Sequence, residues 1–140
     1  MSVKHNFEAW YPELPDLLFG QVMGVDVFNA TKFIELRGVD TSMVNVENYK
    51  TTDIVTIREY SKRLGLNDPE QMFLVDDNGD VMIRAHLAFS FVSYVDPQFS
   101  IYMHDRIHEL FYNGVIVSDS YLAATAKNRL PKSVLQQLAS

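Results

Sequence analysis

Apolar and polar residues follow two periods along this chain of 140 residues, and the period of two indicates strands. Residues 21–28 (Gln-Val-Met-Gly-Val-Asp-Val-Phe) alternate in character after a glycine, which is typical of a strand. Two further apolar runs, 72–75 and 81–83, flank Asn78-Gly79, and this dipeptide is the strongest short-range signal for a β-hairpin. We therefore expect a small antiparallel sheet with one hairpin that projects as a wing.

Helical spacing and helix-end signals predict the remaining elements. The expected helices are 29–37, capped by Asn29 or Thr31 and ended by Gly38; 53–64, capped by Thr51 or Thr52 and ended by Gly65; 85–94; 97–112; and 118–130. We expect an irregular N-terminal arm over 1–19, a loop or short strand over 39–50, and a C-terminal helical extension over 115–140. The pattern as a whole predicts one domain, 1–140, of class α+β, in which the sheet packs against several helices.

Composition indicates an ordinary folded protein and excludes several kinds of site. With 47% hydrophobic and 21% charged residues, the chain can bury a core without covalent cross-links. The absence of cysteine excludes a disulfide scaffold, a cysteine zinc site and a thiol nucleophile. The most apolar window, 85–95, is shorter than the roughly 20 residues that span a bilayer. Because residues 1–10 also lack the pattern of a signal peptide, we expect a cytoplasmic protein with no membrane partner.

The charge of the chain is acidic and unevenly distributed. Twelve Lys and Arg residues face eighteen Asp and Glu residues, which gives a net charge of −6 and excludes a histone-like nucleic-acid coat. Two bases against six acids give 71–110 a charge of −4, whereas three bases against one acid give 111–140 a charge of +2. Any anionic partner must therefore meet a local basic surface.

A zinc site is the first catalytic possibility that the sequence offers. His104 and His108 are spaced i and i+4 on one helix face, and Asp105 stands where zinc proteases of the His-Glu-x-x-His type carry their Glu. Asp is one methylene shorter, and no histidine follows that could supply a third ligand. We expect no metal here, and a metal-dependent hydrolase is only a third hypothesis.

A calcium loop is the second possibility. Asp76, Asn78 and Asp80 match its opening, but Val81 and Leu87 occupy the positions that require Gly and Glu. A hairpin turn explains these residues better. Because a glycine-rich phosphate loop and a nucleophile elbow are also missing, we expect a protein that is not an enzyme and needs no cofactor.

Basic residues offer a different kind of site. Arg58, Lys62 and Arg63 share a broad face of the predicted 53–64 helix. Threonine hydroxyls and free amides at the start of that helix could hold a phosphate. Together with the hairpin tip, the helix would give a groove-and-wing arrangement for DNA. The alternative is that these charges only confer solubility and pair along the helix, for example with Glu59.

Two stretches of the chain resemble the KilA-N domain of DNA viruses and bacteriophages. The first, 25–33, is similar to the strand and Asn-Ala-Thr-Lys sequence of that family. The second, 77–99, resembles its hairpin, its Leu-Ala helix start and its Trp-Ile-Ser-Pro-x-Phe segment, with Tyr94 in place of Trp. The family's second hairpin glycine is Asp80 here. The resemblance covers 20–114.

The resemblance implies a non-enzymatic, regulatory viral or phage DNA-binding protein with a winged-helix-like fold, acting in the cytoplasm of a host cell. Phosphate contacts supply much of the affinity of proteins for DNA, and Lys and Arg residues commonly make them. We therefore expect the basic residues of this protein to contact DNA phosphates. The residues expected to contact DNA are Lys32, Lys50, Thr51, Thr52, Arg58, Lys62, Arg63 and Arg84.

The acidic balance supports a second hypothesis of another class. The fold could be retained while DNA binding is lost, leaving an acidic phage accessory protein that binds and inhibits a host protein. Acidic surfaces attract basic partners that themselves handle nucleic acid. The sequence leaves the formation of a homodimer open.

Overall fold

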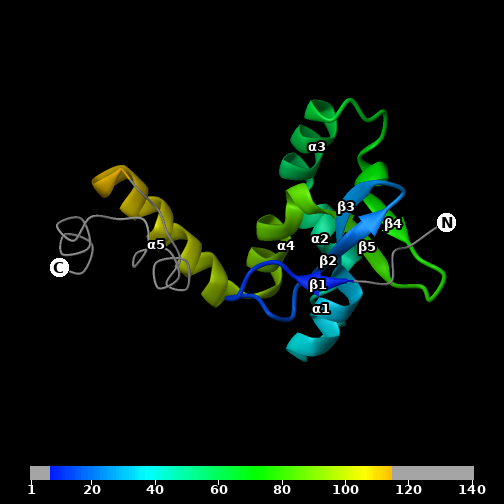
Figure 1. The fold of residues 1–140 in the computed structure, drawn as a ribbon, viewed down its shortest axis with the longest axis horizontal. Helices are drawn as coiled ribbons and strands as arrows, with labels where there is room; N and C mark the ends of the chain where they lie inside the picture. Colours follow the sequence, from blue (N-terminus) through cyan, green and yellow to red (C-terminus); the bar gives the residue numbers. More distant parts are fainter. Residues whose placement is uncertain (1–6, 115–140) are drawn as a thin grey trace. The chain divides into compact units, whose positions relative to one another are not determined.

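The computed structural model describes residues 7–114 and confirms the α+β class (Figure 1). This part of the chain divides into two units after Ser100, and each is described by itself. The first unit holds the sheet, four α-helices and the start of a fifth, whereas residues 101–114 continue that fifth helix in the second unit. No helix within 7–114 is long and apolar enough to cross a membrane.

The sheet has five antiparallel strands in the order β1-β2-β3-β5-β4. The strands are β1 (Glu8–Ala9), β2 (Leu18–Val22), β3 (Val25–Asn29), β4 (Phe73–Val75) and β5 (Val81–Arg84). The predicted hairpin is confirmed, because β4 and β5 pair in register around Asn78-Gly79. The prediction of one strand over 21–28 is wrong. That segment turns at Met23 and Gly24, whose φ angles of 52° and 78° suit a two-residue hairpin turn.

The helices are α1 (Ala30–Arg37), α2 (Val46–Thr52), α3 (Ile54–Arg63), α4 (Ala88–Val95) and α5 (Pro97–Asn113), with short 3₁₀ turns η1 (Pro69–Met72) and η2 (Ala85–Leu87). Helices α1, α3 and α5 follow the predicted segments closely. The expectation of a loop or strand over 39–50 is wrong, because Asn45 caps α2 and Tyr49 anchors it in the core. The helix predicted over 118–130 and the extension over 115–140 lie outside the described residues.

The core is organised around the ring of Phe91 on α4. This ring lies 5.5 Å from that of Phe28 on β3, 6.1 Å from Phe33 on α1 and 5.0 Å from Tyr49 on α2. All four side chains are fully buried. Aromatic pairs at such distances add about 0.5–1.5 kcal/mol each beyond their buried area. One ring therefore joins the sheet to three helices.

The opposite face of the sheet carries a smaller apolar cluster. Val22, Val27 and Met82 are buried there, and Phe7 from the arm packs against them. A Cβ atom on Gly20 would lie 2.5 Å from the Phe7 ring, so a larger residue at this strand position would displace that ring. Phe7, the first described residue, thus partly covers the apolar cluster on this face of the sheet.

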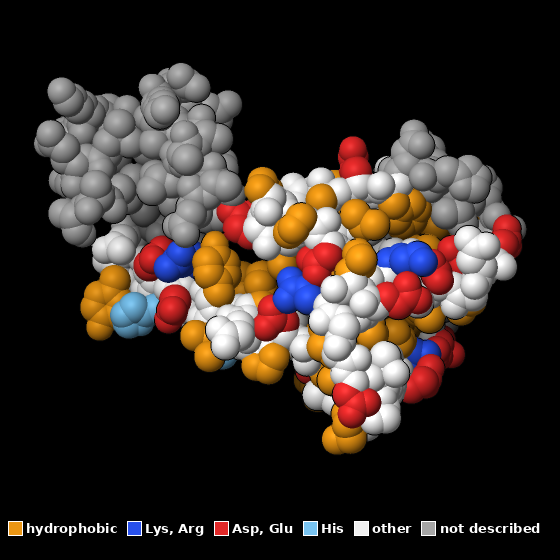
Figure 2. Space-filling model, turned by 90° about the horizontal axis from the view of Figure 1, so that it is seen from below, with side chains coloured by type: hydrophobic (Ala, Val, Ile, Leu, Met, Phe, Trp, Pro, Cys, Tyr) orange, Lys and Arg blue, Asp and Glu red, His pale blue; other side chains and the backbone are white. Residues whose placement is uncertain are grey.

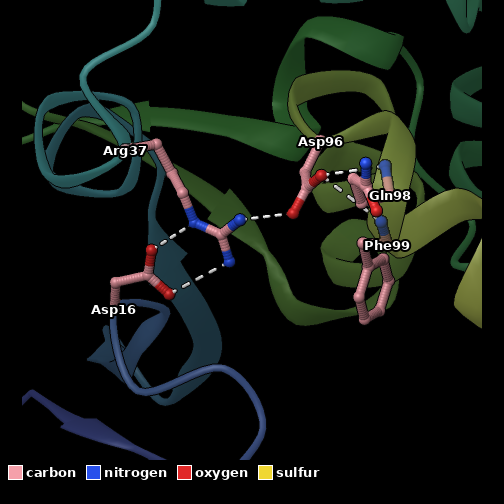
Figure 3. A network of polar contacts seen from close by, with 5 residues as sticks. All are labelled: Asp16, Arg37, Asp96, Gln98 and Phe99. Atoms are coloured by element: carbon pink, nitrogen blue, oxygen red, sulfur yellow. Dashed lines mark hydrogen bonds and ion pairs between the residues drawn. The ribbon is translucent and has the colours of Figure 1, made fainter.

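Arg37 ties the arm to the helices (Figure 3). Its guanidinium, in the last turn of α1, donates to Asp16 on the arm and to Asp96, which precedes α5. Asp96 also accepts from the backbone N–H of Gln98 at 2.9 Å and so caps that helix. The hydrogen bond to Asp16 raises the pKa of Arg37, against the opposing effect of burial, and the bond to Asp96 raises it further. Since the three side chains are only 19–25% exposed, this bridge is shielded from solvent.

Replacing the bridge should destabilise the first unit. We expect Arg37→Met to lower the free energy of unfolding by about 2 kcal/mol, because two carboxylates lose a charged donor at a partly buried position. Urea denaturation followed by circular dichroism measures the change. The matched control is Arg58→Met on the exposed face of α3, which should cost less than about 0.5 kcal/mol. Equal effects of the two substitutions would refute the role of the bridge.

Candidate nucleic-acid interface

Seven Lys and Arg residues lie between residues 7 and 100, and the structure separates them by their partners. Lys32 pairs with Glu35 at 3.3 Å, and Arg37 is held between two aspartates. Lys50 pairs with two glutamates. Lys32 and Lys50, which the sequence predicts to contact DNA, and Arg37 therefore all lie beside carboxylates that compensate their charge.

Lys50 is a partly buried member of the predicted contact residues. Its Nζ atom lies 3.2 Å from Glu47, 3.0 Å from Glu70 and 4.8 Å from the centre of the Phe73 ring. Burial lowers the pKa of Lys50, but hydrogen bonds to Glu70 and Glu47 outweigh it and raise the pKa overall. A phosphate that approaches this lysine would also meet both carboxylates.

Thr51 and Thr52 do not stand at the start of a helix. They are the last residues of α2, and Asp53 alone separates that helix from α3. The prediction that they cap the 53–64 helix is therefore wrong, because the chain is already helical there: the Asp53 N–H donates to the Tyr49 carbonyl at 3.0 Å. The residue that precedes α3 is a carboxylate, which disfavours a phosphate at that end.

A polar network fixes the start of α3. The Tyr49 hydroxyl lies 2.8 Å from Ser90 Oγ on α4, and Ser90 donates to Asp53 at 2.8 Å. Because the Ser90 proton is directed at Asp53, Tyr49 is the donor in the first bond. Burial strongly raises the pKa of Tyr49, so the phenol stays protonated. The network links α2, α3 and α4 and holds α3 in one orientation.

The outer face of α3 carries three of the four cations that remain. We define the α3 face as Val55, Arg58, Lys62 and Arg63, all exposed, with Val55 at 72%. Within residues 7–114, none of the three basic side chains is in an ion pair. The expected alternative of a pair with Glu59 is therefore not formed. Three uncompensated positive charges within two helical turns create a local positive potential on an acidic chain.

Two neighbouring rings border this face. The Arg63 guanidinium lies 5.8 Å from the centre of the Tyr60 ring, and His86 from η2 approaches the same ring at 5.9 Å. Arg84, two residues before His86, donates from Nε to the Gln71 carbonyl at 3.3 Å. Arg84 has no carboxylate partner within the described residues, so its charge is not compensated there, but its side chain is only partly exposed.

The hairpin tip does not lie beside α3. The Asn29 amide donates to Asp80 at 3.1 Å, and the Val81 N–H donates to Thr31 Oγ1 at 2.8 Å, so the tip is fastened to the start of α1. Helix α3 packs against η1 and η2, at the other end of the β4–β5 hairpin (Figure 1). The structure therefore separates the two parts of the expected groove-and-wing arrangement.

The loop at this tip is acidic. Residues 76–80 contain three aspartates and no Lys or Arg. Asp76 Oδ1 accepts from the N–H groups of Asn78 at 2.9 Å and Asp80 at 2.8 Å, which is the bonding of a turn. Within residues 7–114, no three His, Asp or Glu side chains are grouped so that they could hold a metal ion. An acidic tip of this kind repels phosphate rather than binding it.

The Asn-Ala-Thr-Lys sequence has a structural role. Asn29 is 8% exposed and caps α1, since its side chain accepts from the Lys32 N–H at 2.9 Å. Thr31 supplies the acceptor for the hairpin. Hydrogen bonds thus give Asn29 and Thr31, in the first stretch that resembles KilA-N, a structural role.

The two histidines considered for zinc lie in the second unit. His104 and His108 are exposed on α5, and the His108 ring packs 4.4 Å from that of Tyr112. The basic residue between them, Arg106, pairs with Glu109 at 2.8 Å. These contacts are those of an ordinary polar helix face.

Among the other Lys and Arg residues within 7–114, Lys32, Arg37, Lys50 and Arg106 each pair with a carboxylate. On the face drawn in Figure 2, Lys and Arg side chains are few, and carboxylates lie beside them.

Comparisons with protein-family models, with curated proteins and with solved structures found no match for this chain. The membership of the KilA-N family therefore stays a prediction, and the α3 face is identified by its geometry alone.

The role of the Asn-Ala-Thr-Lys sequence can be tested by stability. We expect Thr31→Val, which keeps the shape, to lower the free energy of unfolding by about 1–3 kcal/mol, because the Val81 N–H loses its acceptor. Asn29→Ala should cost a similar amount through the lost cap. Lys32→Ala, the control within the same motif, should change stability by less than about 0.5 kcal/mol. Thermal unfolding measures all three, and a large effect of Lys32→Ala alone would contradict this role.

Proposed function

We propose that this protein binds nucleic acid without catalysis, through the α3 face. One observation carries the proposal: Arg58, Lys62 and Arg63 form the one cluster of Lys and Arg side chains within residues 7–114 that has no carboxylate partner. Cations that need not leave an ion pair bind phosphate with the full gain of counterion release. The predicted contacts at Lys32 and Lys50 lack this advantage.

Duplex DNA fits the α3 face better than a generic polyanion does. A single helix can enter the major groove, where cations contact phosphates and small side chains contact base edges. Val55 and Thr56 are exposed at the start of α3, and an apolar or methyl-bearing side chain there can contact the methyl group of thymine. The resemblance of two stretches to KilA-N also supports DNA binding. By the same resemblance, we propose a regulatory role for a viral or phage protein in a host cell.

Neutralising the α3 face should remove binding. We expect the triple variant Arg58→Gln, Lys62→Gln and Arg63→Gln to lose most of its affinity for random-sequence duplex DNA. The slope of log affinity against log salt should fall by about three, since roughly 0.9 counterions are released per phosphate contact. Fluorescence anisotropy with labelled duplex over a range of salt concentrations measures both quantities.

A second triple variant controls for total charge. Lys32→Gln, Leu36→Glu and Met43→Glu each lower the net charge by one, so both triples carry −9 instead of −6. Leu36 and Met43 are 62% and 69% exposed, so these changes leave the core intact. We expect the control to retain the slope of the unmodified protein. Equal losses in both triples would show that total charge, not the α3 face, determines binding.

A further inference from the structure

A second exposed surface lies on elements that the proposed function does not use. Trp10 and Tyr11 follow β1 on the arm, and Phe89 lies in the first turn of α4. These three side chains, here called the aromatic surface, are 41%, 36% and 42% exposed. Large aromatic side chains that stay in water on a folded domain mark interaction sites when they are contiguous.

The aromatic surface is contiguous and rests on buried rings. Trp10 stacks on Phe19 with ring centres 4.1 Å apart, and Tyr11 meets Phe89 at 5.3 Å. Phe89 in turn stacks on Phe99 at 6.1 Å. Phe19 and Phe99 are 1% and 9% exposed. Because the buried rings fix the exposed ones, a partner would order few side chains on binding.

Charge around the aromatic surface selects among possible occupants. Glu8 is exposed and pairs across the sheet with Phe19, so its side chain projects on the face where Trp10 stacks. Residues 7–16 contain no Lys or Arg, and while Asp16 is compensated by Arg37, Glu8 is exposed beside the rings. Nucleic acid and anionic membranes would meet like charge here.

A second copy of the chain is also disfavoured. A two-fold contact through the same surface would bring the Glu8 carboxylates of both copies together, and each chain carries a net charge of −6. A cationic segment with apolar side chains meets both features of the surface at once. Its apolar groups would be buried against the rings, and its Lys or Arg residues would face Glu8.

We propose that the aromatic surface is a docking site for a basic, apolar segment of a partner protein. Trp10 and Tyr11 are of the residue types that dominate binding energy at interfaces. The proposal does not depend on DNA binding, because the aromatic surface and the α3 face share no residue.

A random peptide library tests the proposal directly, because it samples basic, acidic and apolar segments alike. Displayed dodecapeptides are selected on the full chain and depleted on the double variant Tyr11→Ser and Phe89→Ser. We expect the enriched peptides to combine Lys or Arg with apolar residues. Trp10 is the only tryptophan of the chain, so its fluorescence reports directly on binding of the most enriched synthetic peptide.

The variants make the outcome decisive. The double variant and, separately, Glu8→Lys should each lower the affinity for that peptide by about tenfold or more. A loss of this size is typical of an interface hot spot. The matched control Leu36→Ser and Met43→Ser, exposed apolar positions on other elements, should bind as the unmodified protein does. The proposal is overturned by selection of acidic peptides, by no selection above the depleted background, or by self-association of the protein that the double variant abolishes.

Discussion

The ring of Phe91 determines where the rest of the structure can lie. It packs edge-on against Tyr49, whose hydroxyl reaches Ser90 one residue before Phe91 on the same helix. Ser90 then donates to Asp53, which immediately precedes α3. The buried core therefore orients α3 through one aromatic contact and two hydrogen bonds. The buried residues of α3, Ile57 and Ser61, face inward, and the opposite side of the helix is left in water.

An excess of acids constrains which cations of this chain can act on a partner. Lys32, Arg37 and Lys50 lie within reach of carboxylates, and in the last two cases the contacts join separate elements of the fold. Arg37 and Lys50 thus stabilise the fold, and the charge of Lys32 is compensated by Glu35 on the same helix. On α3, the buried stripe faces the core and no carboxylate of another described element reaches the outer side. The basic residues thus differ in whether a carboxylate compensates their charge, and this difference follows from where the acidic residues lie.

Local signals predicted much of the fold. Asn29 as a cap, Gly38 as a helix stop and Asn78-Gly79 as a hairpin turn are each determined within a few residues, and the structure confirms them. The turn at Met23-Gly24 was missed because a two-residue loop preserves the alternation of the strands it joins.

Other features depend on contacts that spacing along the chain does not reveal. Helix α2 was missed because its residues are weak helix formers, and the burial of Tyr49 stabilises it through tertiary packing. Because this helix was not predicted, Thr51 and Thr52 were expected at the start of a helix, whereas they lie at the end of α2. The pairs Lys50–Glu70 and Arg37–Asp96 join residues distant in the chain, so the sequence could list the cations but not show which were compensated.

The most direct test is to observe which residues a nucleic acid contacts. Two-dimensional NMR of the ¹⁵N-labelled protein, titrated with random-sequence duplex DNA at low salt, reports on every assigned backbone N–H. The structure predicts that the largest shifts lie in α3, Ile54–Arg63, with smaller ones near His86 and Arg84. Shifts concentrated at Lys32 or at the 76–80 hairpin tip, or no shifts at any DNA concentration, would contradict the proposal that the α3 face binds nucleic acid.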